Sequence, residues 1–138
     1  MFARDAALDK ELVAFLDVPE FRSTVLSTLA LRTEEVAKSS PEVIDKIIEF
    51  TKTKELRPLA LEALNHSTSA AKKALPELIK QLENEKQTYM INKLVSIIGK
   101  LGPDAKSAVP VFRKIIAENR GYAAERTEKL LQPMLKDE

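Results

Sequence analysis

The sequence contains no cysteine and no tryptophan, and it has a single histidine, His66. Without cysteine the chain can form no disulfide, no thiolate metal site and no cysteine nucleophile, and one histidine excludes a metal site built from several. The lack of cysteine is compatible with a reducing compartment, so we expect a cytoplasmic protein.

Long apolar segments are also missing. No run approaches the ~18 apolar residues that a membrane-spanning helix needs. The first residues, Met1-Phe2-Ala3-Arg4-Asp5, are not followed by the apolar stretch of a secretory signal. We therefore expect no membrane span and no signal peptide.

Glycine and aromatic residues are scarce, with three glycines and 5% aromatic residues in 138. This composition favours a helix-rich chain over a β-sheet protein or a disordered one, and the 44% hydrophobic and 31% charged content is that of a globular protein. The length suits one domain, residues 1–138.

The formal net charge of +1 conceals a difference between the two halves. Residues 1–69 carry 9 Lys or Arg against 12 Asp or Glu, whereas residues 70–138 carry 13 against 9. The difference can reflect ordinary solvated helix faces, or a mildly basic C-terminal half that favours an acidic partner. Nucleic-acid surfaces cluster Lys and Arg with far less acid between them, so we do not expect a nucleic-acid partner.

One phrase occurs twice, as residues 71–76 (AKKALP) and residues 105–110 (AKSAVP). Pro41 precedes Pro76 by almost the same interval that separates Pro76 from Pro110. Because proline is tolerated in the first turn of a helix, each is predicted to mark a helix start. This interval, a period of about 34 residues, is typical of helical hairpins that bury their apolar faces by stacking.

Apolar residues recur at helical spacing within each period, which predicts four hairpins, approximately residues 5–38, 39–70, 71–104 and 105–138. The stretch from Gly99 to Pro103 is predicted to end a helix, with a glycine in the left-handed conformation. The polar residues Asp5, Asp9, Lys10 and Glu11, and the charged tail at residues 136–138, suit polar capping ends of the array.

The segment Ile98-Gly99 followed by residues 101–110 (LGPDAKSAVP) resembles the inter-repeat segment of HEAT repeats, especially the bacterial short-repeat type. Glu55-Leu56-Arg57 resembles the second-helix pattern of that family, while Asn92 stands where an arginine is expected. Tetratricopeptide repeats have a similar period, but their pattern places a Leu-Gly pair in each first helix, and no predicted first helix of this sequence contains one. The resemblance implies an all-α, right-handed α-α superhelix, an armadillo-type α-solenoid of about four hairpins.

Residues that could support catalysis are few. His66 lies in a predicted helix end and has no Gly-x-Ser-x-Gly elbow to accompany it. Glu34, Glu35, Glu83 and Glu85 lie in predicted turns, match no calcium loop and are interpreted as solvated charges. We expect no enzyme activity, no cofactor and no metal site.

Residues that recur on the second helices are the candidates for partner binding, because in HEAT-like solenoids these helices line the concave face. Tyrosine combines a large apolar body with a polar tip and is enriched at binding hot spots. For each of these candidate residues, the alternative interpretation is a structural role in packing within or between repeats. The candidate set is Arg22, Arg57, Tyr89, Asn92, Lys93, Tyr122 and Arg126.

The sequence therefore predicts a non-catalytic scaffold that binds a protein or peptide along its concave face. The alternatives are an accessory or ligand-binding HEAT-like protein that assists an enzyme, similar to bilin lyases or to relatives that act on DNA bases, and a repeat module of a larger assembly. The absence of tryptophan and the mixed charges weigh against a bilin or DNA role.

Overall fold

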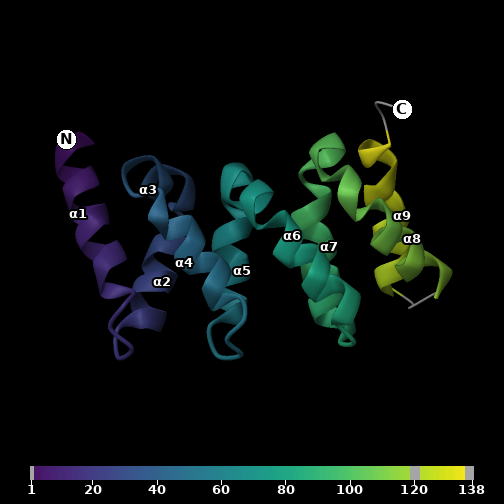
Figure 1. Ribbon diagram of the computed structural model, residues 1–138, viewed down its shortest axis with the longest axis horizontal. Helices are drawn as coiled ribbons and strands as arrows, with labels where there is room; N and C mark the ends of the chain where they lie inside the picture. The colour runs from purple at the N-terminus through teal and green to yellow at the C-terminus, as the bar shows by residue number, and fades with distance from the viewer. Residues whose placement is uncertain (1, 119–121, 136–138) are drawn as a thin grey trace. The chain divides into compact units, whose positions relative to one another are not determined.

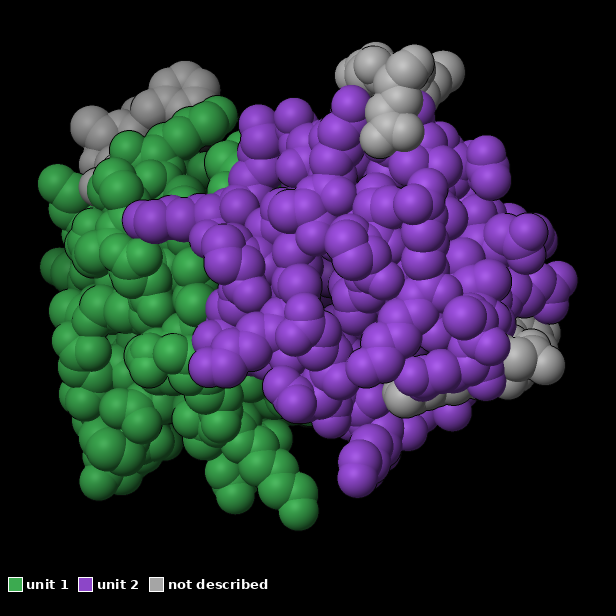
Figure 2. All heavy atoms as spheres, turned by 45° about the vertical axis from the view of Figure 1, so that its right-hand side comes forward, with its two compact units in different colours: residues 1–70 green, residues 71–138 purple. Residues whose placement is uncertain are grey.

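The computed structural model describes residues 2–118 and 122–135, and the side chains of these residues except 2–7, 39, 122 and 123. All regular structure in these ranges is helical, so the all-α prediction is confirmed. The chain divides into two compact units, residues 1–70 and 71–138, coloured green and purple in Figure 2. Each unit is described below by itself.

Unit 1 contains the first five helices and the start of a sixth (Figure 1). Helix α2 packs against α5, α1 packs against α2 and α3, and α4 packs against α3 and α5. The largest fully buried side chains are Leu16, Leu26, Leu29, Ile47, Leu61 and Leu64. The helices are α1 (Phe2–Phe15), α2 (Arg22–Ala30), α3 (Thr33–Ser39), α4 (Glu42–Phe50), α5 (Arg57–Asn65) and α6 (Thr68–Asn84), of which α6 continues into unit 2.

Unit 2 contains the rest of α6, then α7 (Thr88–Gly99), the 3₁₀ helix η1 (Gly102–Ala108), α8 (Val109–Ala117) and α9 (Tyr122–Met134). Both α7 and α8 pack against α9, and η1 contacts all three. The core is formed by Leu78, Ile91, Leu94, Ile97, Ile98 and Phe112.

Helical segments that the sequence did not predict begin at Thr33, at Thr68 and at Gly102, with the same period as the prolines. Those at Thr33 and Gly102 are short helices of seven residues, whereas the one at Thr68 is the first part of the continuous helix α6. At Thr68, the Ser67 hydroxyl accepts a hydrogen bond from the Ala70 amide at 3.1 Å and so caps the start of α6. The segments between the predicted hairpins are thus helical rather than open loops.

Helices that occupy equivalent positions in successive repeats lie side by side within each unit. In unit 1, α2 and α5 begin one period apart and pack together. In unit 2, α7 and α9 also begin one period apart and pack together. A Cβ added to Gly99 would lie 3.0 Å from the side chain of Leu130, so α7 approaches α9 closely at this residue.

The proline predictions hold at two of three positions. Pro41 directly precedes α4, and Pro110 lies in the first turn of α8. Pro76, however, lies inside α6, and its prediction as a helix start is wrong. The cap at Ser67 starts the helix earlier in the sequence, and the buried Ala70, Ala71 and Ala74 hold this added portion against the core.

The end of α7 follows the prediction. The helix ends at Gly99, and Gly102 has a φ of 57°, a left-handed conformation that costs glycine little.

Of the four polar residues expected at the first end of the array, Lys10 and Glu11 are exposed, Asp9 is buried, and the side chain of Asp5 lies outside the described residues. Asp9 is 2% exposed and accepts two hydrogen bonds from the Arg32 guanidinium, at 2.8 and 3.2 Å. The outward residues include Leu8, Phe15 and Phe21, each about half exposed. The charged tail at residues 136–138 lies outside the described residues.

Candidate protein-binding surface

Arg22, the first residue of α2, is held within unit 1 by two contacts. Its Nε donates to the Leu16 carbonyl oxygen at 2.8 Å, and its guanidinium lies 5.3 Å from the centre of the Phe50 ring. These contacts hold the loop before α2 against the end of α4. They give Arg22 a structural role, which is the alternative to a role in partner binding. Arg57, at the equivalent position of α5, is half-buried.

Tyr89 lies in the first turn of α7 and is 66% exposed, an unusual exposure for a large side chain. Lys93, one turn later, donates from Nζ to the tyrosine hydroxyl at 3.3 Å, and its ammonium lies 5.5 Å from the ring centre. The lysine therefore places a positive charge at the hydroxyl end of the tyrosine ring.

Arg126 of α9 is fixed against the same helix. Its Nε donates to the Ser96 hydroxyl at 2.8 Å, and that hydroxyl donates to the Asn92 carbonyl oxygen at 2.8 Å. A second positive charge is thereby anchored to α7 while its side chain stays exposed. Sequence reasoning missed Ser96, although it lies one turn after Asn92 and the i to i+4 spacing was readable.

Asn92 is half-buried, and among the described residues its Oδ1 has no hydrogen-bond partner. A buried acceptor without a donor is unfavourable for folding.

Four of the predicted residues lie together on or against α7, with Ser96 among them. They are Tyr89, Asn92, Lys93 and Arg126, and we name these five residues the α7 ridge.

Tyr122 is the first residue of α9, as predicted, but its side chain lies outside the described residues. The predicted set divides between the units: Arg22 and Arg57 belong to unit 1, and the other five belong to unit 2.

The α7 ridge carries two cations, Lys93 and Arg126, and no carboxylate. The segment from Thr88 to Lys100 contains one further lysine, Lys100, and no Asp or Glu. The nearest acids on α9 in sequence are Glu125 and Glu128, which are exposed. A carboxylate from outside the chain would meet a field of favourable sign here.

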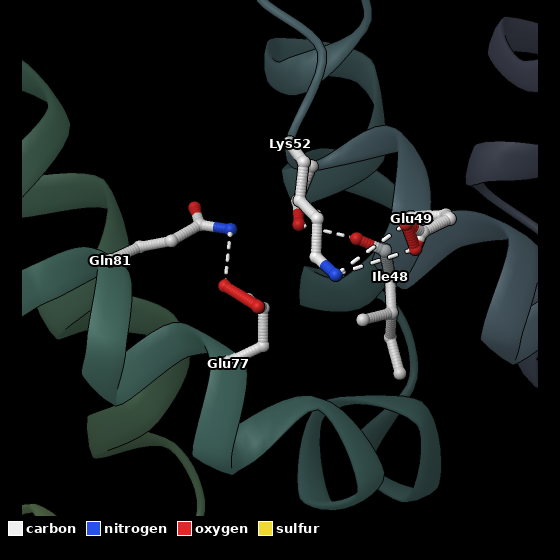
Figure 3. Close-up of polar contacts among 6 residues, drawn as sticks. Ile48, Glu49, Lys52, Glu77 and Gln81 are labelled. Carbon is white, nitrogen blue, oxygen red and sulfur yellow. Dashed lines mark hydrogen bonds and ion pairs between the residues drawn. The ribbon is translucent and has the colours of Figure 1, made fainter.

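Figure 3 shows two polar contacts that are local pairs, each along a single segment. Lys52 Nζ lies 3.4 Å from Glu49 Oε2 at the end of α4, and Gln81 Nε2 donates to Glu77 Oε2 at 3.3 Å on α6. Pairs of side chains three or four residues apart on one helix contribute little to the stability of the fold, and they indicate no ligand site.

Glu34 differs from the solvated turn residue that the sequence suggested. It lies in the first turn of α3, and its carboxylate accepts hydrogen bonds from Ser67 and, at 3.1 Å, from Ser69. The Ser67 hydrogen bond is the largest influence on the Glu34 pKa and holds it below its usual range; burial acts in the opposite direction.

Metal-ligating clusters and membrane-spanning helices are both missing from the described part of the chain. It contains no group of three or more His, Asp or Glu side chains placed to hold a metal ion. None of its helices has the length and apolar character needed to cross a membrane.

No family model matches the sequence, and neither a curated protein nor a solved structure matches the chain. A function must therefore be inferred from the geometry of the α7 ridge.

Proposed function

We propose that this chain is a non-catalytic scaffold that binds an acidic protein or peptide segment along the α7 ridge. The observation that carries the proposal is the arrangement of Tyr89, Lys93 and Arg126: an exposed aromatic ring with an ammonium group at its hydroxyl end, and an anchored guanidinium on the same helix. Such a surface offers apolar contact from the ring and charge pairing from the two cations.

Preorganisation supports the same conclusion. Binding costs conformational entropy when long side chains must be ordered. Lys93 is already held by the Tyr89 hydroxyl, and Arg126 by Ser96, before any partner arrives. Because part of that entropy has been lost on folding, the ridge is suited to binding rather than only to solvation.

We further propose that the repeats stack as a right-handed HEAT-like solenoid. The support is the constant period of the helix starts and the packing of α2 on α5 and of α7 on α9. In such a stack the second helices, including α7 and α9, would share one surface along which an extended partner could lie.

A display library of short random peptides tests the proposal without knowledge of the natural partner. We expect the selected peptides to be enriched in Asp and Glu, and their affinity to fall as salt rises beyond about 0.1 M. In fluorescence anisotropy, Tyr89→Ala should weaken binding at least about fivefold, or ~1 kcal/mol, and Lys93→Glu should weaken it further.

The matched control is Lys106→Glu, which makes the same charge change at an exposed residue of η1. It should leave peptide affinity nearly unchanged, and circular dichroism should show equal helix content in all variants. Selected peptides that lack acidic residues and bind Tyr89→Ala and Lys93→Glu as tightly as the parent would disprove the proposal.

A further inference from the structure

The end of α1 has a structural counterpart one period later, at the end of α4. After α1, the Val18 amide donates a hydrogen bond to the Phe15 carbonyl oxygen at 3.0 Å. After α4, the Thr53 amide donates in the same way to the Phe50 carbonyl oxygen at 3.1 Å. The helices that follow, α2 and α5, also begin one period apart. Phe15 and Phe50 are therefore equivalent residues, and the groups that cover Phe50 indicate what chemistry would cover Phe15.

The preceding repeat places two charged groups on the end of α4. The Arg22 guanidinium lies 5.3 Å from the centre of the Phe50 ring. One turn earlier on α4, the Lys46 ammonium pairs with the Asp17 carboxylate at 2.6 Å. Both Lys46 and Phe50 are half-buried. An arginine on the ring and an ion pair beside it thus form the contact on α4.

Among the described residues, no charged group covers the equivalent part of α1. Phe15 is 46% exposed, and Glu11, which occupies the position of Lys46, is exposed as well. The Glu11 carboxylate makes no ion pair with a described side chain. Both residues line a groove of about 450 Å³, together with Ala14 and Val18. The groove therefore presents a carboxylate beside an exposed aromatic ring.

The charge at the equivalent position is reversed, and this reversal determines the charge of the group that would bind there. On α4 a lysine pairs with an acid, whereas on α1 the acid Glu11 requires a cation. A guanidinium lies over Phe50, and the ring of Phe15 attracts a cation for the same reason. Both contacts on α1 therefore favour positive charge.

The rest of the groove is more apolar than its counterpart. Ala14 and Val18 correspond to Glu49 and Thr53, which are exposed polar residues. On α4 these two positions stay in water, whereas on α1 the apolar surface continues across them. The apolar stem of an arginine packs well on such a surface while its charged end pairs with a carboxylate.

We propose that the groove of α1 binds a basic segment of another protein, with an arginine over Phe15 and a second cation, lysine or arginine, on Glu11. In the contact on α4, Asp17 and Arg22 lie on either side of a turn. The basic segment is therefore expected to carry its two cations at a similar spacing across a turn. This groove belongs to unit 1 and selects positive charge, whereas the α7 ridge belongs to unit 2 and selects negative charge.

A display library of short random peptides tests the proposal with a bait that cannot use the α7 ridge. The bait is the full chain with Tyr89→Ala and Lys93→Glu, and peptides that still bind after Glu11→Lys is added are discarded. We expect the retained peptides to contain arginine and a second basic residue, and their affinity to fall as salt rises beyond about 0.1 M.

Fluorescence anisotropy with one retained peptide measures each contact. Glu11→Lys should weaken binding at least about tenfold, because it sets two cations against each other, and Phe15→Ala at least about fivefold, because the ring is lost. Glu35→Lys makes the same charge change at an exposed residue of α3 that does not line the groove, and it should leave the affinity nearly unchanged. Circular dichroism should show equal helix content in all variants.

A charge exchange separates the contact from any effect on folding. The peptide with Asp in place of its second basic residue should bind the parent weakly and Glu11→Lys tightly, because the exchange recreates the charges of the Lys46–Asp17 pair. Retained peptides without basic residues, no retained peptide at all, or no gain from the exchange would overturn the proposal. A dimer of the parent in sedimentation equilibrium that Phe15→Ala dissociates would overturn it too, since the groove would then be occupied by a second copy.

Discussion

The Ser67 hydroxyl makes two hydrogen bonds that serve different parts of unit 1. It accepts from the Ala70 amide at the start of α6 and donates to the Glu34 carboxylate at the start of α3. Ser67 is 2% exposed, so both bonds form where water competes little. One side chain thus joins the beginnings of α3 and α6.

This contact makes the stability of unit 1 depend on pH. The Ser67 hydrogen bond holds the Glu34 pKa below its ordinary value of 4.5, so the carboxylate stabilises the fold above that pH. Its contribution is lost as the pH falls below 4.5 and through the pKa of the folded state. We expect Glu34→Gln to lower the free energy of unfolding at pH 7 and the difference from the parent to shrink at acidic pH.

Urea unfolding followed by circular dichroism across this pH range measures the effect. Glu35→Gln, an exposed residue of the same helix, is the control and should cost less at pH 7. A gap between parent and Glu34→Gln that stays constant down to pH 3 would show that the Glu34 charge is not involved.

Single residues differed in how far the sequence could place them. Tyr89 was predicted to open a second helix because Tyr122 recurs one period later, and it lies in the first turn of α7. The Ser67 contact was not found, because Glu34 and Ser67 are 33 residues apart and only the packing of α3 near the start of α6 joins them. Asp9 was misplaced for the same reason, since its partner Arg32 is 23 residues away.

At the scale of elements, helix starts were predicted where local chemistry decides them. Pro110 and Gly102 act through their own backbone geometry, and both predictions are confirmed. Pro76 was misread because the Ser67 cap and the burial of alanines in the preceding turns are tertiary effects that outweigh the local preference. The short helices α3 and η1 were missed because each has only seven residues, too few for a periodic pattern.

The two prolines supply a matched pair of substitutions. Pro76 interrupts the hydrogen-bond ladder inside α6, so Pro76→Ala should raise the free energy of unfolding by about 1–2 kcal/mol. Pro110 sits in a first turn and breaks no helical hydrogen bond, so Pro110→Ala should be neutral or slightly destabilising through greater freedom of the unfolded chain. Thermal and urea unfolding measure both; equal effects of the two substitutions would contradict this account.

At the scale of the whole molecule, the packing contacts described for the helices join near neighbours along the chain. In arrays of this kind the stability is approximately a sum of repeat terms and nearest-neighbour terms. A local defect is therefore expected to loosen its own region before the rest of the chain unfolds.

Gly99→Val tests this behaviour. The added side chain would meet Leu130 where α7 and α9 approach closely, and should cost about 1–3 kcal/mol. Hydrogen exchange read by mass spectrometry should show faster exchange in α7 and α9, with smaller changes in α2 and α5. Ala117→Val, at an exposed residue of α8, is the control, and uniform acceleration across the chain would argue for a single cooperative unit instead.

The recurrence of helix starts at Thr33, Thr68 and Gly102 has a consequence for inheritance. Duplication or loss of one whole period by genetic recombination would leave each remaining helix beside a neighbour of the type it has now. Such an array can change length between generations while its interior stays filled, so selection can act on the number of repeats separately from the residues on their surface.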